Sequence, residues 1–217
     1  MGSITRSFAN NITTSGVLLP ASLNNNSIAN VTEYNAAIAT GNMVLLSTQT
    51  ASNSASISFT TGIDSTYKEY QFWFVDIHPR TDGAQLSFQG STNGGSTYAT
   101  TMTTTTFRAY HDEADTGTAL VYVTGFDQAQ GTGYQLLTGG LGNGADENSC
   151  GSLILFNPAS TTYVKHFIST KQIYEATNFS ENNFNAGYFN TTSAINAIDF
   201  KMSSGNFDGT ILLYGIV

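Results

Sequence analysis

Alternation of apolar and polar residues recurs along this chain and constrains its fold more than any other feature. Segments 56–60, 85–89 and 198–202 each place an apolar residue at every second position. A period of two puts successive side chains on opposite faces of a strand, one face towards a core and one towards water. Turn signals such as Asp82-Gly83 and Asn93-Gly94-Gly95 separate the segments. Many short strands punctuated in this way predict an all-β sandwich or barrel.

The character of the chain changes near residue 42. Residues 1–42 contain asparagine pairs and scattered single apolar positions, which indicate an extended, mostly irregular N-terminal arm. Residues 43–217 carry the strand signals and form the expected sandwich domain. The closing run 203–217 reads as a turn and then an apolar strand, so we expect the C-terminus to be tied into a sheet.

The chain has few charges, and most of them are negative. Charged residues make up 10% of the sequence, against about 25% in an average globular protein. The net charge is −8, and the seven basic residues form no cluster, which argues against binding to nucleic acid or to an anionic membrane surface. We find no apolar run long enough for a transmembrane helix and no signal-peptide pattern, and expect neither.

Three segments are apolar on both faces, namely 70–77, 153–156 and 211–217. In a two-sheet sandwich only one face of a strand meets the core, so the second face needs another cover. The N-terminal arm, a long loop or a second copy of the chain would provide it, and we favour a subunit interface. The candidate interface residues are Phe72, Trp73, Phe74, Leu213 and Ile216.

The densest acidic cluster lies in residues 111–115. His111, Asp112, Glu113 and Asp115 could together hold a divalent cation through oxygen and nitrogen ligands. The spacing matches no EF-hand loop, because the glycine and the distal glutamate are absent. A solvated loop is the simpler interpretation, and we expect no bound cofactor.

Two further places could carry chemistry. Asp76 and His78 stand two residues apart on an expected strand, but a hydrolytic pair needs a nucleophile, and the Gly-x-Ser-x-Gly pattern is missing. Cys150 is the one cysteine, so an internal disulfide is excluded and we expect a small buried or half-buried thiol, which the structure is to test. These observations predict a protein that is not an enzyme.

Several aromatic residues stand among asparagine, serine and glycine near the end of the chain. They are Tyr174, Phe179, Phe184 and Tyr188. Aromatic rings beside amide side chains can bind sugars by stacking and hydrogen bonding, so these four are candidate glycan or receptor contacts. The alternative is that the rings are buried beneath a long loop.

An ordered set of short motifs resembles one protein family. The motifs are the tyrosine-rich 67–72, the Pro-x-x-Asp turn 79–82, the Asn-Gly-Gly turn 93–95 and the terminal Gly-x-Ile-x-Leu-Tyr-Gly of 209–215. In this order they resemble structural proteins of tailed-bacteriophage virions, over residues 43–217. The resemblance implies a jelly-roll sandwich on the outside of the particle, as a capsid decoration, head fibre or tail appendage, and commonly as a homotrimer.

The sequence and the resemblance together predict a non-enzymatic virion component. Residues 1–42 would dock to capsid or tail proteins, and residues 43–217 would trimerise and face outward. A lectin-like protein or carbohydrate-binding module that recognises a host-surface glycan is the alternative. A hydrolase that uses Asp76 and His78 ranks last.

Overall fold

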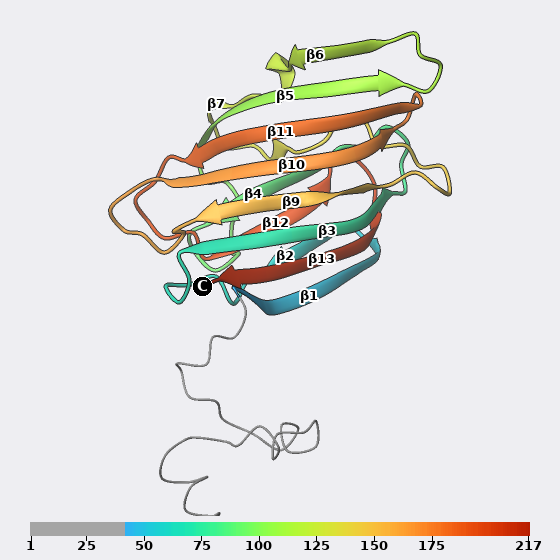
Figure 1. The fold of residues 1–217 in the computed structure, drawn as a ribbon. Coiled ribbons are helices and arrows are strands. Elements are labelled where there is room, and N and C mark those ends of the chain that lie inside the picture. Colours follow the sequence, from blue (N-terminus) through green and yellow to red (C-terminus); the bar gives the residue numbers. More distant parts are fainter. Residues whose placement is uncertain (1–41) are drawn as a thin grey trace, which may run out of the picture. The chain divides into compact units, whose positions relative to one another are not determined.

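A computed structural model describes residues 42–217 and contains two antiparallel sheets packed as a sandwich (Figure 1). The predicted all-β sandwich is therefore confirmed, whereas the expected N-terminal arm lies almost wholly outside the described residues. The strands are β1 (Met43–Ser54), β2 (Ser56–Phe59), β3 (Glu69–Pro79), β4 (Leu86–Ser91), β5 (Met102–Asp112), β6 (Thr118–Tyr122), β7 (Ala129–Gly131), β8 (Gln135–Leu136), β9 (Ser149–Phe156), β10 (Lys165–Glu175), β11 (Phe179–Phe189), β12 (Ala197–Met202) and β13 (Phe207–Ile216). No helix in this part of the chain is long and apolar enough to cross a membrane.

The two sheets differ in size. The large sheet has the order β1-β13-β3-β9-β10-β11-β5-β6, with β7 beside β5, and the small sheet has the order β2-β12-β4-β8. The first strand pairs with the last, and the second with the one before the last. This nested pairing is the one expected of a jelly roll. The large sheet thus extends beyond the small one at β11, β5 and β6, which lie at the top of Figure 1.

Aromatic side chains form the centre of the core between the sheets. Phe200 of β12 contacts Phe59, Phe72, Phe74 and Phe88, with ring centroids 5.0 to 6.3 Å apart, mostly edge to face. All five rings are almost fully buried. They come from both sheets, so they join the two layers, and edge-to-face packing adds to the burial of their large apolar area.

The structure corrects three of the five candidate interface residues. Phe72, Phe74 and Leu213 point into the core and are buried within a single chain, so they cannot contact a second copy. Strand alternation then places Trp73 and Ile216 on the opposite side of the large sheet. We call this side, which faces away from the small sheet, the outer face.

A bulge near the end of β3 reshapes one edge of the outer face. Asp76 has a positive φ of 52°, and the register with β9 shifts between Phe74 and Ile77. The neighbouring strand shifts at the same level, where Gly209 has a φ of 131° and a Cβ atom would lie 2.7 Å from the Asp76 carbonyl oxygen. Only glycine fits this close approach. The bulge turns Asp76 outwards, next to the pocket described below.

The inner face of the large sheet is polar where the small sheet ends. Glu181 of β11 pairs with Arg108 of β5 at 2.7 Å, and its other oxygen accepts a hydrogen bond from Asn183 at 2.9 Å. Residues 135–141 cover this region, and Gln135 accepts a hydrogen bond from Thr104 at 2.7 Å. Polar side chains take the place of an apolar core here, beneath the two-residue strand β8 and the loop that follows it.

Candidate functional site

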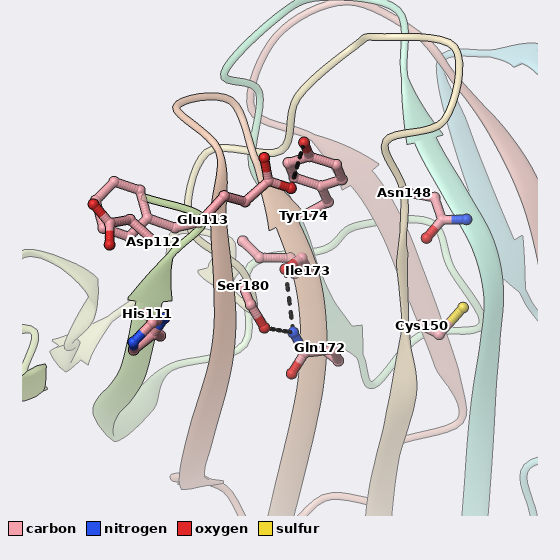
Figure 2. A pocket seen from close by; sticks show the side chains of 10 residues that line it. His111, Asp112, Glu113, Asn148, Cys150, Gln172, Ile173, Tyr174 and Ser180 are labelled. Carbon is pink, nitrogen blue, oxygen red and sulfur yellow. Dashed lines mark hydrogen bonds between the residues drawn. The ribbon is translucent and has the colours of Figure 1, made fainter. Parts of the chain in front are cut away.

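A pocket of about 530 Å³ opens at one end of the outer face (Figure 2). Four neighbouring strands, β5, β11, β10 and β9, each contribute to it together with the loops that join them. Its lining residues are His111, Asp112, Glu113, Asn148, Cys150, Gln172, Ile173, Tyr174, Phe179 and Ser180. We call it the end pocket.

The hairpin between β10 and β11 forms the central wall of the end pocket. Tyr174 is the last residue but one of β10, Phe179 begins β11, and Asn178 in the turn has a positive φ of 67°. Asparagine tolerates this left-handed conformation better than most residues. The Tyr174 hydroxyl donates a hydrogen bond to Glu113 Oε1 at 3.0 Å, which raises the pKa of Tyr174. The bond links the hairpin to the turn that follows β5.

Amide and hydroxyl side chains line the centre of the end pocket. Gln172 Nε2 donates to Ser180 Oγ at 2.9 Å, and Gln172 Oε1 accepts from Asn182 Nδ2 at 3.2 Å. Both partners lie on β11, so the three side chains form a short polar ladder across two strands. Figure 2 shows Gln172 and Ser180 side by side below Glu113 and Tyr174. These groups offer both donors and acceptors to a ligand.

The far wall belongs to β9 and the bulge in β3. Cys150 is an exposed free thiol, and its sulfur accepts a hydrogen bond from the Asp76 backbone N–H at 3.4 Å. The Asp76 carboxylate accepts another from Asn148 Nδ2 at 3.1 Å. His78 instead bonds through Nδ1 to the Glu147 carbonyl oxygen at 2.7 Å. The two members of the predicted Asp76–His78 pair therefore have different partners, and both serve to hold the loop before β9.

The acidic cluster of residues 111–115 is divided among separate contacts. Asp112 accepts hydrogen bonds from the backbone N–H groups of Thr116 and Gly117 and from the Thr116 hydroxyl, and these bonds lower its pKa. His111 contacts Asp115 at 3.2 Å. Within residues 42–217, no three His, Cys, Asp or Glu side chains are grouped so that they could hold a metal ion.

The four candidate glycan contacts do not form one site. Tyr174 and Phe179 line the end pocket, whereas Phe184 stacks on Phe107 in the middle of the outer face. Tyr188 lies beside His166 at the other end, next to a second hollow of about 480 Å³. Two of the four aromatic residues thus lie at the end pocket, and the other two lie elsewhere on the outer face.

Sequence reasoning missed most of the apolar side chains on the outer face. Exposed large hydrophobic residues project from this face on five strands, and they are Met43, Leu45, Trp73, Val75, Phe107, Leu120, Tyr122 and Ile168. Residues 119–123 are apolar throughout, so the sequence of β6 does not show which of its side chains face outward. A strand whose solvent-exposed side is apolar has the same sequence pattern as a strand whose apolar side faces a core.

Comparison with protein-family models, with curated proteins and with solved structures found no match to this chain. The features that bear on function are therefore the outer face, the end pocket and the motifs of the sequence.

Proposed function

We propose that this protein is a non-enzymatic structural component of a tailed-bacteriophage virion, exposed on the particle as a capsid decoration, head fibre or tail appendage. Residues 1–42 dock to capsid or tail proteins, and the sandwich self-associates as a homotrimer. The observation that carries the proposal is the outer face, which is broad and apolar although the chain as a whole has a net charge of −8. Monomeric proteins rarely leave such a face in water.

The contacts of the reactive side chains support a role without catalysis. Asp76, His78 and Asp112 each hold a neighbouring loop by hydrogen bonds to backbone or amide groups. The Cys150 thiol contacts Asp76 and not a histidine base. A nucleophile needs an adjacent base that activates it, and these contacts provide structural support instead.

The virion proposal is tested on particles of the phage that encodes the chain. We expect purified particles to contain the protein in a fixed ratio to the major capsid or tail protein, measured by quantitative mass spectrometry. A chain that lacks residues 1–42 should fold but be lost from the particles. Absence of the full-length protein from purified particles contradicts the proposal, and retention of the shortened chain contradicts the docking role of the arm.

A second candidate function, glycan binding, is favoured by the end pocket. Neutral sugars are bound by planar aromatic rings together with amide, hydroxyl and carboxylate groups. The end pocket combines Tyr174 and Phe179 with Gln172, Ser180 and Glu113. We expect Gln172→Ala and Phe179→Ala to abolish binding on a glycan array, whereas Tyr188→Ala, outside the pocket, should not change it. Equal binding by all three variants contradicts this assignment.

A further inference from the structure

The centre of the outer face is an uncharged surface, mostly apolar, built from cross-strand pairs. The register places seven of its side chains in one row, Leu212, Trp73, Ser152, Thr170, Phe184, Phe107 and Tyr122. Trp73 and Phe107 are 42% and 43% exposed within the chain. These large rings lie in water unless another surface covers them, and burial of apolar area stabilises an association by about 25 cal/mol per Å² before its costs.

A second row runs parallel to the first and is also uncharged. It contains Leu45, Tyr214, Gln71, Ile154, Ile168 and Ala186. Ile168 is 50% exposed, and beside it lies a hollow whose lining includes His166, Ala186 and Tyr188. The face thus has both protruding rings and a hollow of about 480 Å³ that can receive a side chain.

The distribution of charge singles out this face. Neither central row contains an aspartate, glutamate, lysine or arginine, although the chain has 15 acidic and seven basic residues. Acidic side chains gather instead at the end of the sheet, in the loops around Asp82, Asp115 and Asp146. Two identical chains of net charge −8 repel each other at most orientations. The outer face is where they can meet without placing like charges together.

The size of the face suits a stable interface. Eight strands about 4.8 Å apart span roughly 34 Å, and strands of ten or eleven residues reach roughly 35 Å. The resulting sheet area is roughly 1,000 Å², above the roughly 800 Å² that each partner contributes to a standard interface. We propose that copies of this chain contact one another through the outer face of the large sheet. This inference rests on the self-association in the proposed function and assigns it to one surface.

A second copy fits this face better than a charged partner does. A charged partner would find no complementary charge on either central row, and burying its own unpaired charges there would be costly. A second copy carries the same apolar rings and the same apolar hollow. A ring of one copy can therefore enter the hollow of the next. The remaining alternative is that residues 1–41 of the same chain cover the face, and the test below separates it from self-association.

The test introduces a charge at the centre of each row in the full-length chain. Trp73→Glu and Ile168→Glu change side chains that project into solvent and leave the core intact. Tyr163→Glu is the matched control, because Tyr163 is 71% exposed in the loop between β9 and β10 and belongs to neither row. Sedimentation velocity gives the association constant of each chain, and thermal melting under monomeric conditions shows that each is folded.

We expect wild type and Tyr163→Glu to associate equally, and the two face variants to associate at least about 100-fold more weakly. Leu120→Lys, at the edge of the face, should weaken the association less than the two central variants do. It keeps the test decisive if a central variant does not fold. If wild type is oligomeric and the face variants associate equally well, the assignment to the outer face is wrong while the proposed self-association stands. If wild type is monomeric, the proposed self-association and its assignment to the outer face are both wrong. Residues 1–41 are then the segment left to cover the outer face.

Discussion

The rings of Phe107 and Phe184 stack in parallel on the outer face, with their centroids 4.8 Å apart and their planes 9° from each other. They are direct cross-strand partners on β5 and β11. Phe184 is the more covered of the two, and Phe107 is 43% exposed. The pair therefore stabilises the contact between two strands and at the same time leaves part of an aromatic side chain in solvent.

Phe184→Ala separates these two roles. Loss of the stacked pair should lower the free energy of unfolding by about 1 kcal/mol, since an aromatic pair contributes roughly 0.5–1.5 kcal/mol beyond its buried area. Self-association should fall by at least about tenfold. Urea unfolding and light scattering measure the two effects. Phe200→Ala in the core is the contrast, with an expected loss of about 3–5 kcal/mol. Unchanged association of Phe184→Ala contradicts its place in the interface.

Lys171 makes stability depend on pH in the alkaline range. Its amine is fully buried, donates hydrogen bonds to the Ser152 carbonyl oxygen and to Ser169 Oγ, and has a pKa well below the usual value because of desolvation. The unfolded chain therefore binds more protons than the folded one between the lowered pKa and about 10.4, so stability rises with pH in that window.

Lys171→Met removes this dependence. We expect the variant to be more stable than wild type at pH 7, by on the order of 1 kcal/mol or more, because no amine has to be desolvated. The difference should shrink as the pH approaches 9. Urea unfolding at several pH values measures it, with Lys165→Met as the comparison, since the pKa of Lys165 is also lowered but less strongly. A difference that stays constant with pH contradicts the account.

Arg108→Ala should lower the stability of the fold, because it leaves the buried Glu181 carboxylate without its ion-pair partner. Desolvation already raises the pKa of Glu181 despite the ion pair at 2.7 Å, and removal of the guanidinium raises it further. A raised pKa in the folded state means that stability falls as pH rises above the unfolded value of about 4.3. The variant should therefore lose about 3–5 kcal/mol at neutral pH and less near pH 4. Guanidinium unfolding at both pH values checks this, and an equal loss at both contradicts it.

The rate at which the Cys150 thiol reacts with a reagent shows whether the outer face is covered. Cys150 is the single cysteine of the chain and is exposed on β9. In the Trp73→Glu monomer its thiol should react with a disulfide reagent like an ordinary accessible cysteine. In assembled wild type the reaction should slow by about tenfold or more, because reactivity depends on access. Equal rates at the same protein concentration would place the assembly surface elsewhere.

The small sheet and the turns could be predicted from local sequence. The alternating segments 56–60, 85–89 and 198–202 lie on or extend β2, β4 and β12, and Gly83, Gly94 and Gly95 have the positive φ values that their turns need. The expected exposure of the polar face was wrong for β4 and in part for β12, because Ser87, Gln89 and Asp199 are buried. The Gln89 amide donates to the carbonyl oxygens of residues 132 and 133. A loop distant in sequence covers it.

The outer face and the polar interior could not be predicted in the same way. Phe72 and Trp73 are equally apolar in sequence, and only the pairing of β3 with its neighbours decides which of them enters the core. Burial of Lys171 contradicts the usual exposure of lysine. It follows from Gly151, whose lack of a side chain leaves room beside the lysine stem. Such features arise from the topology and not from local pattern.

The solution mass of the full-length chain, measured by light scattering over a wide range of concentrations, shows directly whether its copies self-associate. We expect a stable trimer near three times 23.1 kDa, in which the outer faces are shielded from water. A mass that stays at 23.1 kDa at every concentration would contradict self-association and leave the glycan-binding end pocket as the better supported function.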